Sequence, residues 1–100
     1  MRLFEQHDED GRVFAFEVKD FFLARPRIYR LVAKIPGARV KRKPKLFSSL
    51  REEVFCEFEL EGVTFVAWEP FGDNPRYWIG PEPARWVPQI EKVREFFSRG

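Results

Sequence analysis

The side chains that commonly perform catalysis are few and scattered in this chain of 100 residues. His7 is its single histidine and lies beside an acidic, turn-forming cluster. Cys56 is its single cysteine and lies within an alternating apolar segment, where a thiol usually packs as a small hydrophobic group. A nucleophile–histidine arrangement would need His7 as its base, and one histidine with one cysteine falls short of the usual ligand set of a zinc site. We therefore expect no enzyme, no catalytic residue, no metal and no cofactor.

Residues 69–78 are denser in chemistry than the rest of the chain. The segment combines turn-forming residues with flat amphipathic aromatic side chains of the kind found at binding hot spots. We predict a partner-binding site made of Asp73, Arg76, Tyr77 and Trp78. The alternative is a plain turn between two strands, with Arg76 paired locally and Trp78 packed in the core.

Charge is distributed unevenly along the sequence. The stretch from Phe21 to Arg51 holds ten basic residues and no acidic residue. The rest of the chain holds eight basic residues against all 16 acidic ones, so the net charge of +2 conceals a bipolar molecule. Such asymmetry indicates a charged partner.

The basic residues of this stretch recur at helical and then at strand spacing. Three of them share one side of an expected helix, and alternate residues of the next segment share one face of an expected strand. We predict an anion-binding surface made of Arg27, Arg30, Lys34, Arg39, Lys41 and Lys43. The expected partner is a nucleic acid or an acidic protein surface. The alternative is that the basic strand pairs with Glu57 and Glu59 across a sheet, which would make a charge-complementary solvent face.

The N-terminal part of the chain has the pattern of a hairpin followed by a helix. Segments 2–6 and 12–18 flank an acidic turn that ends in a glycine, and the second segment places Phe14, Phe16 and Val18 on one face. A helix is expected from Pro26 to the Pro-Gly pair at 36–37. Its apolar stripe consists of Ile28, Leu31, Val32 and Ile35.

The strongest local signal is a second hairpin in the C-terminal half. Segments 53–60 and 63–69 are joined by Glu61-Gly62, a turn of the tight two-residue kind. With that turn, one face is apolar throughout and is expected to be buried; it consists of Val54, Cys56, Phe58, Leu60, Val63, Phe65 and Ala67. The opposite face consists of Phe55, Glu57, Glu59, Thr64, Val66 and Trp68.

These elements predict one α+β domain over residues 1–100. A basic strand at 38–45, a short strand at 76–79 and a final helix from Pro88 complete the order β-β-α-β-β-β-β-α. An antiparallel sheet of about five to six strands with both helices on one face satisfies the apolar patterns best. The lone cysteine and the lack of an apolar run near the roughly 20 residues of a membrane helix favour a cytoplasmic protein without membrane contact.

The expected function is that of a small binding protein. In the first hypothesis the basic helix–strand face engages a nucleic acid or an acidic protein. In the alternative, the chain is an inhibitory module of the immunity or antitoxin type, and it acts through its acidic strand face or its aromatic segment. Neither hypothesis implies a small-molecule substrate.

Overall fold

The computed structural model describes residues 2–19, 25–42, 54–69 and 76–99. They form the predicted order of elements: β1 (Arg2–His7), β2 (Val13–Lys19), α1 (Arg25–Lys34), β3 (Ala38–Arg42), β4 (Val54–Leu60), β5 (Val63–Trp68), β6 (Arg76–Pro81) and α2 (Ile90–Arg99). The α+β class and the element order predicted from the sequence are therefore confirmed. Among the helices of these ranges, neither is long and apolar enough to cross a membrane.

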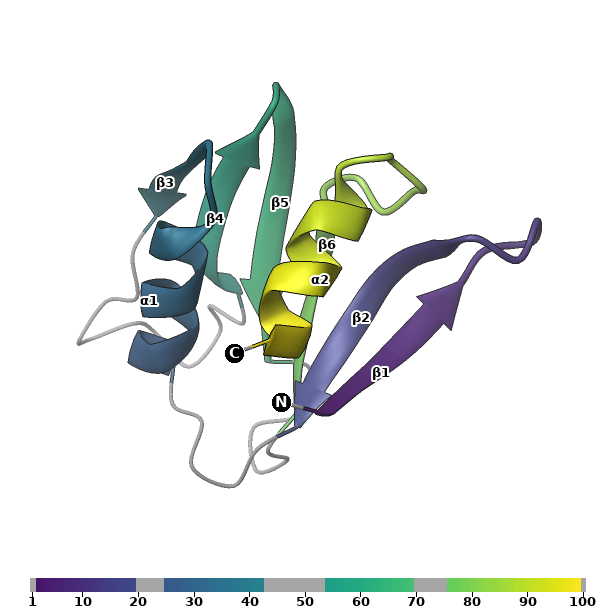
Figure 1. Cartoon of the computed structure of the whole chain (residues 1–100), viewed down its shortest axis with the longest axis horizontal. Helices are drawn as coiled ribbons and strands as arrows, with labels where there is room; N and C mark the ends of the chain where they lie inside the picture. Colours follow the sequence, from purple (N-terminus) through teal and green to yellow (C-terminus); the bar gives the residue numbers. More distant parts are fainter. Residues whose placement is uncertain (1, 20–24, 43–53, 70–75, 100) are drawn as a thin grey trace.

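The six strands form one open antiparallel sheet in the order β1-β2-β6-β5-β4-β3. Figure 1 shows both helices on the same side of this sheet, α1 beside β3 and β4, and α2 in front of β2 and β6. The β4–β5 hairpin turns through Glu61 and Gly62, whose φ angles of 51° and 81° are the pair that a tight two-residue turn requires. One sheet face is thus covered by helices, and we call the other the open face.

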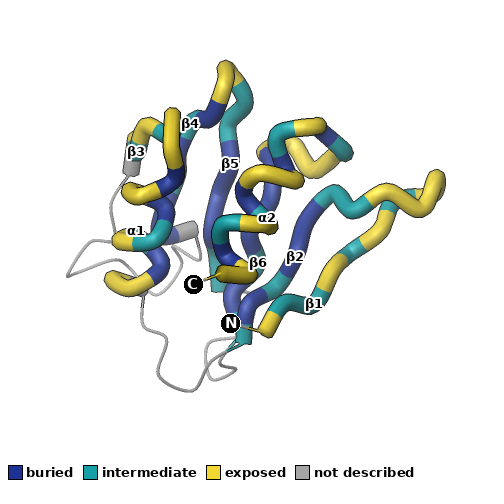
Figure 2. Tube along the Cα trace, in the orientation of Figure 1, coloured by how far each residue is buried: buried dark blue, intermediate teal, exposed yellow. Residues whose placement is uncertain are grey.

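The core lies between the helices and the sheet. Phe58 and Phe65 face each other across β4 and β5 with their rings stacked at 5.3 Å, and both are fully buried. Phe97 of α2 packs against Phe16 of β2 at 5.6 Å. Figure 2 shows this buried layer as the dark blue stretches of the central strands and of the inner sides of the helices. The predicted apolar face of the second hairpin is buried at five positions, Cys56, Phe58, Leu60, Phe65 and Ala67.

A β-bulge in β4 corrects the predicted face assignment at one end of that hairpin. The register shifts between Val54 and Cys56, so that Val54 pairs with Trp68 and Cys56 pairs with Ala67. Phe55 was expected on the opposite face, but it is buried in the core with its ring edge against Tyr77 at 5.6 Å. Because the bulge adds one residue, strict alternation fails at this point.

A second bulge affects the N-terminal hairpin. Gln6 pairs with Ala15 and His7 pairs with Val13, so Phe14 has no partner across β1. The prediction that Phe14 shares a face with Phe16 and Val18 is wrong, because Phe14 instead lines a cavity of the open face. The two bulges therefore move aromatic side chains to the faces opposite those predicted.

Candidate functional site

The predicted cations of α1 form a row on the outer surface of the helix layer. Arg27, Arg30 and Lys34 are exposed, while Ile28 and Val32 of the same helix are fully buried against the sheet. At 100° per residue the three cations lie within about 60° of one another around the helix axis. The structure thus brings the helical half of the predicted anion-binding surface together.

The predicted cations of β3 lie on a different face of the molecule. Val40 packs against the core, whereas Arg39 is directly opposite Glu59, which belongs to the open face. Lys41 reaches the same carboxylate, with its Nζ 2.8 Å from Glu59 Oε2. The hydrogen bond and charge of Lys41, aided by the charge of Arg39, lower the pKa of Glu59.

The six predicted cations therefore do not form one continuous face. The sheet separates the α1 row from the β3 cations, and Lys43 lies outside the described residues. A bulge between Val40 and Arg42 also interrupts the alternation on which the strand prediction relied. The pairing of β3 with the glutamates of β4 is the arrangement named as the alternative, and it partly neutralises the strand cations.

The predicted partner-binding segment is divided between the two faces in the same way. Tyr77 is 7% exposed and belongs to the core. Arg76 and Trp78 lie on the open face, where Arg76 stacks over the Phe4 ring at 4.0 Å and approaches Glu17 at 3.9 Å. Asp73 lies outside the described residues. Of the three predicted residues that the structure describes, Arg76 and Trp78 share a surface and Tyr77 does not.

A cavity of about 370 Å³ on the open face contains Trp78 and was not predicted from the sequence. It is lined by Gln6, Phe14, Val66, Trp68, Trp78, Glu82 and Ala84. The two indoles meet edge to face, with centroids 6.1 Å apart and an interplanar angle of 65°. Trp78 Nε1 donates a hydrogen bond to Gln6 Oε1 at 2.8 Å, and Gln6 Nε2 donates one to Glu17 Oε1 at 3.3 Å. These bonds hold the indole of Trp78 in one orientation.

The position of Trp78 depends on the residue two places along β6. A Cβ atom built on Gly80 would lie 2.6 Å from Cη2 of Trp78 and 2.8 Å from Cβ of Ala15. The indole of Trp78 therefore packs directly against the backbone of Gly80, where there is no room for a side chain. Gly80 pairs with Val66, which is 4% exposed and closes the inner end of the cavity. A glycine inside a strand commonly marks such a close approach, but the strand predicted from the sequence ended at residue 79 and so placed Gly80 outside it.

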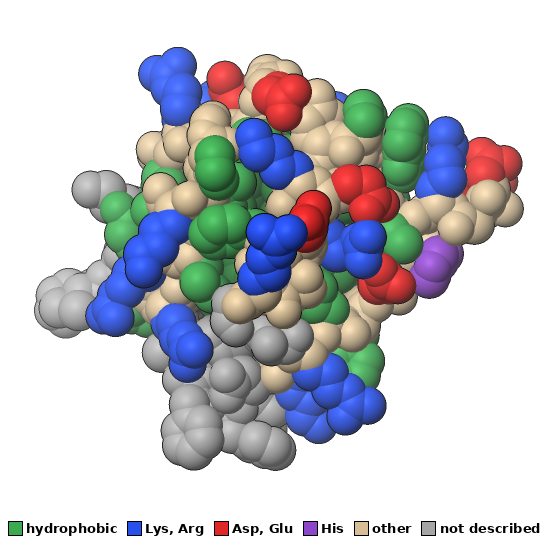
Figure 3. Space-filling view, viewed as in Figure 1, with side chains coloured by type: hydrophobic (Ala, Val, Ile, Leu, Met, Phe, Trp, Pro, Cys, Tyr) green, Lys and Arg blue, Asp and Glu red, His purple; other side chains and the backbone are tan. Residues whose placement is uncertain are grey.

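A smaller cavity of about 180 Å³ lies on the helix side. Its lining consists of Pro36, Lys92, Glu95, Phe96 and Arg99. Figure 3 shows hydrophobic side chains gathered between the basic row over α1 and the basic side chains over α2. Pro36, just after α1, and the half-buried Phe96 of α2 are the apolar residues of this cavity, and we call the strip between the helices the interhelical groove.

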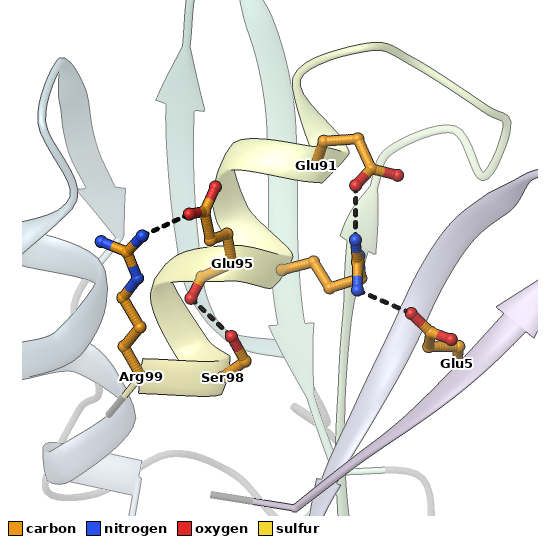
Figure 4. Close-up of polar contacts among 6 residues, drawn as sticks. Glu5, Glu91, Glu95, Ser98 and Arg99 are labelled. Carbon is orange, nitrogen blue, oxygen red and sulfur yellow. Dashed lines mark hydrogen bonds and ion pairs between the residues drawn. The ribbon is translucent and has the colours of Figure 1, made fainter.

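Ion pairs hold the charges along α2 in place (Figure 4). Arg99 pairs with Glu95 at 2.5 Å on the side that faces α1. Arg94 bonds to Glu91 at 2.6 Å and to Glu5 of β1 at 2.9 Å, which links α2 to the sheet. The bonds with Glu91 and Glu5 raise the pKa of Arg94. Lys92 forms no ion pair within the described ranges, so no described carboxylate balances its charge on the α2 side of the interhelical groove.

The residues suited to catalysis are far apart. Cys56 is fully buried in β4, and His7 is exposed at the end of β1, four strand positions away. At about 4.8 Å per strand this separation is roughly 19 Å. In the described ranges no three His, Cys, Asp or Glu side chains are grouped to hold a metal ion.

Cys56 should behave as an unreactive thiol in the folded protein. Burial, with a smaller contribution from the charge of Glu57, raises its pKa to about 12. At pH 8 a thiol reagent should therefore label the native protein far more slowly than the urea-unfolded protein, measured by mass spectrometry over time. Since the unfolded thiol ionises near pH 9.0, the free energy of unfolding should also fall as the pH rises from there toward 12. Equal labelling rates in the two states would contradict the placement of Cys56.

The chain matches no protein-family model, and no curated protein and no solved structure shows significant similarity to it.

Proposed function

We propose that this protein is a non-enzymatic binding protein whose interhelical groove holds an acidic amphipathic segment of a partner protein. The observation that carries the proposal is the charge of α1, which has basic residues at 25, 27, 30 and 34 and no acidic residue. A basic residue such as Arg27 near the helix N-terminus opposes the helix dipole, whereas Lys34 in the last turn complements it, so the basic N-terminal half of α1 does not serve helix stability. It favours an external anion instead.

The groove beside this row favours a protein partner over a nucleic acid. An amphipathic helix docks by laying apolar side chains into a hydrophobic groove. Pro36 and Phe96 supply apolar surface and Lys92 also lines the groove, while Arg30 and Lys34 are exposed on the neighbouring helix α1. None of these three cations has an ion pair within the described residues, so each remains available to a carboxylate. A phosphate backbone would use the cations but would gain little from the apolar strip.

A reducing, cytoplasmic setting belongs to the same proposal. The single cysteine is buried in the core, and small domains of oxidising compartments usually carry paired cysteines. The acidic-face alternative receives less support, because Glu59 is bonded to Lys41 and Glu57 is opposite Arg42 in the β3–β4 register.

The charge reversal Arg30→Glu with Lys34→Glu tests the groove. The probe is a short amphipathic peptide with leucine on one face and glutamate on the other, and its affinity is measured by calorimetry. Since an exposed ion pair is worth roughly 0.2–1 kcal/mol and repulsion replaces attraction, we expect about a tenfold loss of affinity. Binding by the wild-type protein should also weaken as salt is added.

The matched control carries the same charge change elsewhere. Arg2→Glu with Arg85→Glu alters two exposed residues outside the helix layer and should leave peptide binding nearly unchanged. A peptide with glutamine in place of glutamate should bind weakly. Equal binding of the two peptides, or a preference for an oligonucleotide over the acidic peptide, would refute the proposed partner.

A further inference from the structure

The open-face cavity is independent of the interhelical groove, because the sheet lies between them. It has three aromatic walls, Phe14, Trp68 and Trp78, and among the described residues of its lining the one carboxylate is that of the exposed Glu82. Its volume of about 370 Å³ is that of a small ligand site. The described lining contains no lysine or arginine.

The electrostatics of these walls favour a positive charge. An aromatic ring has a negative face, and tryptophan attracts cations most strongly among the aromatic side chains. Trp68 and Trp78 are set at 65° to each other, so they form two walls of a corner rather than a stack. The carboxylate of Glu82 adds a negative charge at the rim and disfavours an anionic ligand.

The chain's own cations nearby are already engaged with other rings. Arg76 lies over Phe4 at 4.0 Å, and Arg12 lies over Trp86 at 4.6 Å. Within the described residues no cation lies over Trp68 or Trp78. The two indoles of the cavity are therefore available to a cation from outside.

The hydrogen-bonding capacity of the lining indicates which kind of cation fits. The side-chain oxygen of Gln6 already accepts a hydrogen bond from Trp78, and its amide nitrogen donates one to Glu17, so Gln6 offers little to a ligand. A guanidinium or a primary ammonium would lose hydration and find mainly Glu82 as an acceptor. A quaternary ammonium needs no hydrogen-bond acceptor and gains from contact with aromatic faces.

We propose that the cavity lined by Phe14, Trp68, Trp78 and Glu82 is a binding site for a trimethylammonium group. The group lies in the corner formed by the two indoles, and Glu82 balances its charge from the rim. Its source is either a trimethylated lysine side chain of a protein or a small choline-type solute.

The test is a nuclear magnetic resonance titration that follows the three indole N–H signals. The probes are the N-acetyl amide of trimethyllysine, its uncharged carbon isostere, the unmethylated lysine derivative and choline. The signals of Trp68 and Trp78 should shift with trimethyllysine while that of Trp86 stays in place. The isostere and the unmethylated probe should each bind about tenfold more weakly.

Two variants separate the cavity from effects on folding. Trp68→Leu keeps an apolar side chain but removes a ring, and it should weaken trimethyllysine binding about tenfold. Glu82→Gln changes an exposed side chain without threatening the fold and should cost roughly two- to fivefold. The matched control, Glu9→Gln in the exposed N-terminal turn, should have no effect.

The results identify the source or overturn the proposal. Tighter binding of trimethyllysine than of choline supports a protein side chain, and equal binding supports a small solute. Equal binding of the charged probe and its isostere, or no indole shift with any probe, would refute a cation site.

Discussion

Replacing Phe58 with alanine should lower the free energy of unfolding by about 3–5 kcal/mol, the range measured for large aromatic truncations in well-packed cores. Phe58 is fully buried, and its ring stacks on Phe65 at 5.3 Å. The truncation removes this contact and leaves a cavity between β4 and the helix layer. Urea unfolding followed by circular dichroism measures the loss.

Thr64→Ala is the matched control for this change. Thr64 is the residue of β5 next to Phe65, but it points to the open face and is only half-buried. The control should cost less than about 1 kcal/mol, as for a surface substitution. A comparable loss from both variants would show that the two faces of the hairpin are not distinguished by burial.

The substitution Gly80→Ala should destabilise the protein by about 1–3 kcal/mol, as overpacking does in other cores. If the new Cβ met no clash, the substitution would instead stabilise the protein, since alanine is favoured over glycine inside a strand by roughly 0.5–1 kcal/mol. The new Cβ would lie 2.6 Å from the Trp78 ring and 2.8 Å from the Cβ of Ala15, so one of them must move. Unfolding in urea gives the sign and the magnitude.

The second substitution Ala15→Gly should partly rescue that variant. Removing the Cβ of Ala15 clears one of the two close contacts, so the double variant should be more stable than the sum of the single effects predicts. Tryptophan fluorescence should change in Gly80→Ala, because the indole of Trp78 is displaced from Gln6. A neutral or stabilising Gly80→Ala would mean that the indole does not rest on this glycine.

Local patterns predicted the elements of the fold well. Glu61-Gly62 specified a tight turn, and that turn alone aligned Phe58 with Phe65 and Leu60 with Val63. The apolar stripe of the first helix was also predicted, with Ile28, Val32 and Ile35 buried and Leu31 half-buried, because burying a face at 3.6-residue spacing requires no knowledge of distant residues. The bulge at Phe55 was not predictable in this way, since an inserted residue has no periodic signature and reverses the alternation beside it.

The residues of a candidate site could be predicted to lie together only where they all belong to one helix or strand. The row of Arg27, Arg30 and Lys34 follows from helical spacing and is present. The expected continuation of this row onto β3 is absent, because Val40 packs against the core and strand alternation then places Arg39 on the far face, opposite Glu59. The aromatic cavity draws on β1, β2, β5, β6 and the loop after it, and the order of those strands cannot be read from local pattern.

The place of β6 in the sheet has a consequence for how the chain folds. Because β6 lies between β2 and β5, the strands before it can form only two separate units, β1-β2 and β3-β4-β5. Joining them pairs Phe16 with Ile79, a contact of long sequence separation that forms slowly because a large loop must close first. Until then both units expose strand edges that invite pairing with other chains. The cavity exists only once β6 is in place, so a ligand bound there would favour the joined sheet by mass action and protect those edges.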